Sequence, residues 1–357
     1  MVLMSSKEGA INYQKGDIDL GFCKSCGFIF NYSYNSNLLK YSEDYECWQG
    51  YSNTFNNFSN QLVSTLINKF NIKNKNVIEI GGGTGEFLVE LCTRGNNNGI
   101  CFDPAYWPRK NQLNKKVTFI KDYYSEKYSQ HKADLIVCRM VLEHIDTAYK
   151  LLKTIRKAIA DNNTNVCFQV PNANEILKNG AFWDIYYEHC NYFSKEALIY
   201  LFHSAGFNVF DMWDAFNKQY LLLMANTSLK KGRSISLSRL KRQVKYFQSV
   251  KNIKINDWSN RISAESKKEK SIVIWGSSSK AVSFVDTLKL TDEIKYIVDI
   301  NPFRQNSYLS GSGHRIVGPN YLKNNKPDII IIMNPVYIIE IGLMIQNLGL
   351  EVEILNL

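Results

Sequence analysis

The sequence predicts an α/β protein in which two tandem, doubly wound, Rossmann-like domains follow a short N-terminal module. Its 357 residues, 45% of them apolar, exceed what one small core needs. Two segments, 76–103 and 271–299, each run from an apolar strand through a turn of small residues and a helix to a strand that ends in Asp. Strands that alternate with helices in this way indicate β-α-β units and parallel sheets.

The expected parts follow one another along the chain. We expect a short module over 1–50, a first doubly wound domain over 51–227, a basic helical linker over 228–270 and a second doubly wound domain over 271–357. Further strands are predicted over 117–120, 133–138, 165–170, 208–213 and 219–225, the last two as an antiparallel edge. Helices are predicted over Thr147–Ala160 and Lys195–Ala205, the second capped by Ser194 and ended by Gly206.

The composition predicts a soluble cytoplasmic protein. The N-terminus M-V-L-M-S-S-K-E lacks the apolar run of a signal peptide, and the most apolar run, Ile329–Met333, is far shorter than the roughly 20 residues of a membrane span. Six of the eight cysteines stand singly in the sequence: Cys47, Cys92, Cys101, Cys138, Cys167 and Cys190. This scatter is typical of free thiols in a reducing compartment.

The net charge of +10 comes from one segment. Residues 230–270 carry 13 Lys or Arg and three acidic residues, which accounts for the whole excess. A basic face can bind nucleic acid or a phosphorylated ligand. We favour a solvated linker helix here and expect a small-molecule substrate rather than a nucleic-acid partner.

The stretch E-I-G-G-G-T-G, residues 79–85, carries the strongest chemical signal. Glycines at a strand-to-helix turn let the backbone approach a ligand and direct its amides at that ligand. A dinucleotide site needs G-x-G-x-x-G/A, but the sixth position counted from Gly81 is Glu86. The acidic Glu79 followed by Gly81, Gly83 and Gly85 resembles instead the first motif of class I S-adenosylmethionine methyltransferases.

Four further residues complete the expected S-adenosyl-L-methionine site. Asp103 follows Gly85 by 18 residues and is placed to accept both ribose hydroxyls. Asp122 follows the third strand and is placed to accept from the adenine amino group, with Tyr123 available to stack. Arg139 ends the fourth strand, where it would meet the cofactor carboxylate or a substrate anion.

Two Glu-His pairs raise the question of a catalytic base. Glu143-His144 follows the fourth strand, and we interpret His144 as a helix-start residue that braces the loop. Glu188-His189 stands in W-D-I-Y-Y-E-H-C-N-Y-F-S, in an irregular segment after the fifth strand. Because loops at the carboxyl ends of such strands line the substrate crevice, the second pair is the better candidate.

The chain resembles the three-domain sugar C-methyltransferases over nearly its whole length. The residues that carry this resemblance are G-D-I-D-L-G-F-C-K-S-C-G-F-I, E-I-G-G-G-T-G, Y-Y-E-H-C-N-Y-F-S and the late V-D-I-N-P-F-R-Q…G-S-G-H. The resemblance implies a zinc-binding N-terminal module, a methyltransferase domain and a second Rossmann-like domain that binds a nucleotide-activated deoxysugar. It also implies methylation of a carbon beside a ketone.

The resemblance implies catalytic roles for one cluster. His189 would be the general base, Glu188 would orient it or bind a hydroxyl, and Tyr186 would donate to the developing enolate oxygen. A further tyrosine from before the glycine loop would be Tyr45 or Tyr51, and of these two we assign Tyr51 to the site.

Cys23 and Cys26 form half of a zinc ribbon. Four thiolates usually hold such an ion, and the second pair of the resembled family lies upstream of where this chain begins. Cys47 has a poor spacing for a third ligand. We therefore expect an incomplete module.

The last domain has a reduced glycine loop, with Gly276, Ser278 and Ala281 at the three loop positions. This loop suits a phosphate better than a dinucleotide. By resemblance, Lys280, Asn301, Arg304 and His314 would bind the nucleotide-sugar. The family more often has Lys at Arg304 and a shorter G-T-H at G-S-G-H, which leaves the substrate identity open.

The predicted function is therefore an S-adenosylmethionine-dependent C-methyltransferase that acts through a His-generated enolate. An O- or N-methyltransferase on the same scaffold stays open, as does a non-catalytic nucleotide-binding scaffold. A nicotinamide oxidoreductase is disfavoured, because neither glycine loop has the dinucleotide spacing.

Overall fold

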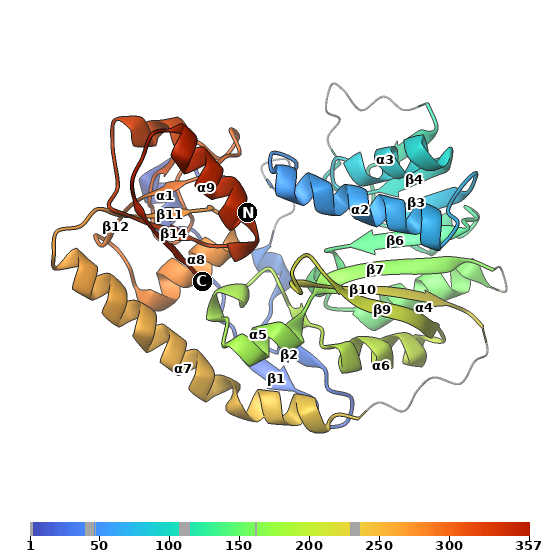
Figure 1. Cartoon of the computed structure of the whole chain (residues 1–357). Coiled ribbons are helices and arrows are strands. Elements are labelled where there is room, and N and C mark those ends of the chain that lie inside the picture. Colours follow the sequence, from blue (N-terminus) through green and yellow to red (C-terminus); the bar gives the residue numbers. More distant parts are fainter. Residues whose placement is uncertain (1–2, 40–45, 47, 107–114, 161–162, 229–235) are drawn as a thin grey trace.

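The computed structural model describes residues 3–39, 46, 48–106, 115–160, 163–228 and 236–357. Figure 1 shows two α/β domains side by side, with the long helix α7 (Ser238–Ser266) running along one side of the molecule between them. Each domain contains a sheet with helices on its faces, so the predicted α/β class is confirmed. None of the described helices is long and apolar enough to cross a membrane.

The first domain is built on a seven-stranded sheet of order β5-β4-β3-β6-β7-β10-β9. Its strands are β3 (Asn76–Ile80), β4 (Asn98–Phe102), β5 (Val117–Ile120), β6 (Leu135–Arg139), β7 (Asn165–Pro171), β9 (Asn208–Ala215) and β10 (Tyr220–Asn226). The first five are parallel, and β10 pairs antiparallel with both β7 and β9, as predicted for the edge. The strand order reverses between β3 and β6, and ligands of such sheets bind at that point.

Helices cover both faces of this sheet. On one face, α2 (Asn53–Lys69) and α3 (Glu86–Gly95) pack on Leu135 and Val137 of β6. On the other face, α4 (Ala148–Ile159) and α6 (Lys195–Ala205) pack on the alternate residues of the same strand. A short helix, α5 (Ala173–Asn179), follows β7.

The predicted ends of α6 are confirmed. The Ser194 hydroxyl accepts from the backbone N–H of Ala197, and Gly206 ends the helix at φ 92°. The helix predicted over Thr147–Ala160 is α4, one residue shorter at each end.

The second domain holds a five-stranded, wholly parallel sheet of order β13-β12-β11-β14-β15. Its strands are β11 (Ile272–Trp275), β12 (Ile294–Val298), β13 (Ile316–Val317), β14 (Ile329–Ile332) and β15 (Glu353–Asn356), with helices α8 (Ser279–Leu288) and α9 (Ile338–Asn347). All four residues of β14 are isoleucines and all are buried, which is typical of a parallel strand covered on both faces.

The N-terminal segment is shared between the two domains. Strands β1 (Leu20–Phe22) and β2 (Ile29–Asn31) form a small sheet with β8 (Asn191–Tyr192), which begins two residues after His189. Helix α1 (Lys7–Ile11) instead lies against the second domain, where Gly311 N–H donates to the Ala10 carbonyl at 2.8 Å. The described part of residues 1–50 therefore packs against both domains. The predicted domain boundaries stay predictions.

Helix α7 lies in the predicted basic linker and is more than a solvated connection. Leu240, Trp258 and Ile262 are buried, and Trp258 packs edge-on against Phe284 of α8 at 5.4 Å. Seven of the basic residues counted above lie in α7 on its less buried positions: Arg239, Lys241, Arg242, Lys245, Lys251, Lys254 and Arg261.

One side chain of the second domain caps a helix of the first. The Glu340 carboxylate accepts from the Ser52 hydroxyl at 2.6 Å and from the N–H groups of Asn53 (3.0 Å) and Thr54 (3.2 Å), at the start of α2. Burial opposes ionisation of Glu340, but these hydrogen bonds outweigh it and lower the carboxyl pKa. The contact joins the two domains beside the site described below.

We expect Glu340→Ala to lower the free energy of unfolding by about 1–2 kcal/mol, since α2 loses its acceptor. The measurement is urea unfolding, with Glu351→Ala at an exposed position as the matched control. Because the folded-state pKa is lowered, the difference between wild type and Glu340→Ala should be full above pH about 4.5 and shrink as pH falls below that value. Equal stabilities at neutral pH would contradict this role.

Candidate active site

A cavity of about 1750 Å³ lies at the carboxyl ends of the strands of the first sheet. It is lined by the glycine loop and by residues that follow β4, β6 and β7, and Ser278, Ser279 and Arg304 of the second domain close it. A second cavity of about 720 Å³ lies between the domains and shares Tyr51, Tyr186 and Tyr220 with the first. The smaller cavity has the size of a single small-molecule site, and the larger one exceeds it, so it has room for more than one ligand. The residues common to both linings place the two cavities next to each other.

The glycine loop joins β3 to α3 and needs its glycines. Gly81, Gly83 and Gly85 have φ of 71°, 57° and 86°, a region that side-chain-bearing residues rarely adopt. A Cβ at Gly85 would stand 2.2 Å from the Phe119 ring, whereas a Cβ at Gly83 would meet nothing within 4 Å. The loop is therefore closely packed at Gly85 and open to the cavity at Gly83.

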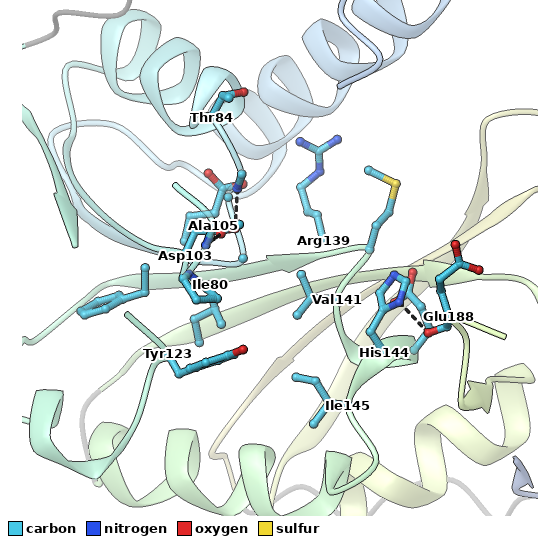
Figure 2. A pocket seen from close by; sticks show the side chains of 18 of the residues that line it. Ile80, Thr84, Asp103, Ala105, Tyr123, Arg139, Val141, His144, Ile145 and Glu188 are labelled. Atoms are coloured by element: carbon cyan, nitrogen blue, oxygen red, sulfur yellow. Dashed lines mark hydrogen bonds between the residues drawn. The ribbon is translucent and has the colours of Figure 1, made fainter. Parts of the chain in front are cut away.

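Asp103 holds the glycine loop in place from the end of β4. Its carboxylate accepts from the N–H of Gly83 at 2.7 Å and of Ala105 at 2.8 Å (Figure 2). Burial raises its pKa, and the two N–H donors act in the opposite direction. Each carboxylate oxygen of Asp103 accepts one backbone N–H and keeps a further lone pair. These remaining lone pairs could accept hydrogen bonds from the two hydroxyls of a ribose.

Asp122 and Tyr123 lie at the rim of the same cavity. The Asp122 carboxylate pairs with Lys127 and accepts from the Tyr128 hydroxyl at 2.6 Å, and these bonds lower its pKa to about 2. The Tyr123 ring is 66% exposed and lies on the cavity side of the loop (Figure 2). An exposed ring at this position is available to stack on a base.

Arg139 and Glu79 form a buried polar pair under the loop. Arg139 donates through Nε to Gln169 at 2.9 Å and lies over the Phe87 ring, 4.0 Å from its centre. Burial raises the Glu79 pKa to about 7, against the opposing charge of Arg139. Among the described residues, Nη2 of Arg139 and Oε2 of Glu79 have no hydrogen-bond partner. Arg139 lines the cavity, so its guanidinium suits the carboxylate of a ligand bound there.

His189 lines the cavity from the segment that leads into β8. Its ring contacts Tyr186 (4.3 Å between ring centres) and His144 (4.8 Å), and its Nδ1 has no partner among the described residues. Burial lowers its pKa well below the ordinary value, and His144 and Lys280 act in the same direction. A neutral imidazole that lines a cavity can accept a proton from a ligand.

The structure brings the two Glu-His pairs together, which sequence reasoning missed. His144 Nδ1 lies 2.7 Å from the Glu188 carbonyl oxygen, so the loop is braced as predicted for His144. The His144 ring also lines the cavity beside His189. The signal available in the sequence was the presence of two Glu-His pairs. Their proximity could not be predicted from it, because it depends on how the insertion after β7 folds.

Tyrosines surround the His189 end of the cavity. Tyr186 is half-buried, and desolvation raises its pKa well above the ordinary value. Tyr51 packs edge-on against Trp48 at 4.2 Å. Tyr220 lines both cavities from the start of β10, and no local sequence pattern pointed to it. Tyr45, the alternative to Tyr51, lies outside the described residues.

Three of the four residues predicted to bind the sugar nucleotide line the smaller cavity. Lys280 pairs with Asp184 at 2.7 Å, Asn301 donates to Glu46, and Arg304 reaches the Glu46 carbonyl and Asp299. His314 lines neither cavity. Its ring nitrogens bond to Ser312 and to the Thr291 carbonyl, so its observed role is to hold a turn.

Cys23 and Cys26 lie in the turn between β1 and β2. The Cys23 Sγ is 3.0 Å from the Ser25 hydroxyl, which lowers the Cys23 pKa to about 6, whereas burial raises that of Cys26. Within the described ranges, no third His, Cys, Asp or Glu comes close enough to form a metal site with them, and Cys47 lies outside those ranges. The zinc site stays a prediction.

Two family models match the chain, one on each domain. Residues 55–211 match a methyltransferase domain, and residues 224–347 match a C-methyltransferase C-terminal domain. The first match shows a methyltransferase domain over these residues, which agrees with the predicted enzyme class. The second match falls on α7 and most of the second sheet.

Individual proteins resemble parts of the chain. The C-methyltransferase NovU of Streptomyces niveus is 28% identical over 145 residues, which is 39% of this chain, so the match spans about a third of that protein (34%). Magnesium protoporphyrin IX methyltransferase from Synechocystis is 16% identical over 49% of this chain and 84% of its own, with a TM-score of 0.38. A Burkholderia thailandensis N1-methyltransferase is 14% identical over 49% and 80%, also at 0.38. At these TM-scores the two structures add nothing to the fold described above.

Proposed function

We propose that the chain is an S-adenosylmethionine-dependent C-methyltransferase that acts beside a ketone of a nucleotide-activated deoxysugar. The observation that carries this proposal is the position of His189, a buried imidazole with an unpartnered Nδ1, in the same cavity as the glycine loop and Asp103. The match to NovU and to a C-methyltransferase C-terminal domain supports the choice of carbon as the methyl acceptor.

The residues at the loop end fit the methyl donor. Asp103 would take the ribose hydroxyls, Tyr123 would stack on the adenine, and the free Nη2 of Arg139 would meet the methionine carboxylate. When bound, S-adenosylmethionine supplies a methyl group on a positively charged sulfur that a carbanion can take up. Gly83, where a Cβ would enter open space, leaves room for the donor against the backbone.

The residues at the other end fit proton abstraction. A C–H beside a ketone must lose its proton before the carbon becomes a nucleophile, and His189 would receive that proton. The Tyr186 hydroxyl, which burial keeps protonated, would donate to the enolate oxygen that develops. Glu188 accepts from Ser279 of α8 at 3.0 Å, so its carboxylate is oriented by the second domain.

The smaller cavity would hold the nucleotide. Lys280 and Arg304 line this cavity together with Gly276, whose φ of 107° favours glycine. The backbone amides of the loop at Gly276 and the two cationic side chains together suit a diphosphate. The connection of the two cavities near Tyr51, Tyr186 and Tyr220 would let one substrate reach from the nucleotide site to His189.

The test uses a nucleotide-linked 4-keto-deoxysugar in deuterated water. We expect deuterium to enter the carbon beside the ketone and, with S-adenosylmethionine present, a methyl group to appear on that carbon in the NMR spectrum of the product. Methylation on oxygen or nitrogen without exchange would instead establish the alternative transferase. Absence of S-adenosylhomocysteine binding in calorimetry would favour a non-catalytic scaffold.

A further inference from the structure

Glu143 is a buried acid that lines the cavity and has no part in the mechanism described so far. It stands in the 3-10 turn Leu142–His144 directly after β6, and its side chain is 1% exposed. Its Oε2 has no hydrogen-bond partner among the described residues. A buried carboxyl that lacks a partner is costly, so its position needs an explanation.

The Glu143 carboxyl faces the two histidines of the site. One oxygen of Glu143 and one ring nitrogen from each of His144 and His189 all lie within 4.8 Å of one another. Since the Glu188 carbonyl can only accept, the neutral His144 ring carries its proton on Nδ1. His144 is thereby held in one tautomer, whereas His189 keeps an unpartnered Nδ1.

Two carboxylates lie near this cluster: Glu188, whose charge acts on His144, and the exposed Asp146, whose charge acts on Cys190. The titratable groups that act on Glu143 or His189 come from four other elements, and they are Cys138 of β6, Cys190 beside β8, Tyr220 of β10 and Lys280 of α8. Burial raises the pKa of Cys138 well above its ordinary value, that of Cys190 to about 12 and that of Tyr220 above its ordinary range, so these three stay neutral near pH 7. Lys280 is already paired with Asp184.

We propose that Glu143 is the positioning residue that makes His189 an effective base, because its carboxylate balances the charge of the imidazolium that forms when His189 takes a proton. The proposal rests on the function proposed above and assigns Glu143 no contact with substrate. In the productive state Glu143 is ionised and both imidazoles are neutral. The C–H bond of the substrate breaks, its electron pair stays in the enolate, and the proton bonds to His189, which gives an adjacent cation and anion.

The protonation state of Glu143 then controls activity. With Glu143 protonated, proton transfer to His189 would leave an unbalanced buried cation, which is strongly unfavourable. Burial raises the Glu143 pKa to about 8. Turnover should therefore rise with pH through about pH 8 and level off above it, instead of following the ordinary histidine range.

A metal ion is the competing explanation of the cluster. Ligands of a tetrahedral zinc ion at about 2.0–2.1 Å lie about 3.4 Å apart. The separation of up to 4.8 Å among these three atoms is wider, so the distances favour a charge-balancing role.

The direct test is NMR of the protein with ¹⁵N-labelled histidines, which number five. His189→Asn assigns the His189 signal, and titration from pH 6 to 10 follows it in wild type, Glu143→Gln and Glu143→Asp. We expect the His189 signal of wild type to move with a midpoint of about 8, no such transition in Glu143→Gln, and a transition with a shifted midpoint in Glu143→Asp. The His314 signal, held by Thr291, serves as the internal reference for folding.

Turnover supplies an independent readout. Loss of an opposite charge at this separation weakens a base by about 1–3 pK units, so Glu143→Gln should be about 10–10³-fold slower and lack the rise near pH 8. A His189 signal that titrates identically in wild type and both variants would overturn the proposal, as would displacement of the signals by micromolar zinc alone. The protein could show the expected dependence of the His189 titration on Glu143 and still methylate no keto-sugar. That result would overturn the proposed function and leave the proposed role of Glu143 toward His189 intact.

Discussion

Replacement of His189 by Asn lowers the rate of methyl transfer by about 10²–10⁴-fold, the usual contribution of a general base. Asn is smaller than His and keeps one acceptor, but it cannot take up a proton at neutral pH. The exchange of substrate hydrogen with solvent should fall in parallel, because both processes begin with the same C–H cleavage. The measurement is single-turnover methyl transfer beside deuterium uptake followed by NMR.

The matched control for this variant is His203→Asn. His203 is half-buried on α6 and lines neither cavity, so its rate should stay within about twofold of wild type. S-adenosylhomocysteine affinity should be unchanged in both variants, since no donor-binding residue is altered. Near-normal turnover by His189→Asn would remove this residue from the mechanism.

Replacement of Asp103 by Ala should lower S-adenosylhomocysteine affinity by about 10²–10⁴-fold. Hydrogen bonds to a charged group contribute about 1.5–3 kcal/mol each, and each 1.4 kcal/mol is a factor of ten in affinity. The variant would lose the two expected bonds to the ribose, together with the acceptor that holds Gly83 N–H at 2.7 Å. Isothermal titration calorimetry measures the change.

Asp122→Asn is the comparison that separates position from charge. Its carboxylate is half-buried and already bonded to Lys127 and Tyr128, so a weaker effect, below about tenfold, is expected. Equal losses in the two variants would mean that net negative charge, rather than the placement of Asp103 under the loop, governs donor binding.

Local pattern was sufficient for most of the fold. The spacing of Gly81, Gly83 and Gly85 predicted a strand-to-helix turn, and all three have the positive φ that only glycine adopts freely. Ser194 and Gly206 predicted both ends of α6 within one residue, since caps are local hydrogen-bonding features. The antiparallel edge was predictable because β9 and β10 are consecutive and joined by a short turn.

Long-range contacts decided what the sequence left open. His314 matched a motif, yet its ring is used by Ser312 and Thr291, because the turn around it packs on the first residues of the chain rather than on the cavity. The N-terminal segment was predicted as a separate module, but β2 pairs with β8, which lies more than 150 residues later in the chain. Neither contact has a local signature.

The sequence by itself determined the two doubly wound domains, the glycine loop and the candidates at Asp103 and His189, because strand and helix periods and turn residues act over a few neighbouring positions. Only the tertiary structure decided that Glu143-His144 and Glu188-His189 meet in one buried cluster. The two pairs are 45 residues apart in the chain, and the insertion after β7 must fold back against the end of β6 before their side chains touch. Burial then shifts the pKa values of Glu143 and His189 and so determines their charges. A local sequence pattern does not predict this burial.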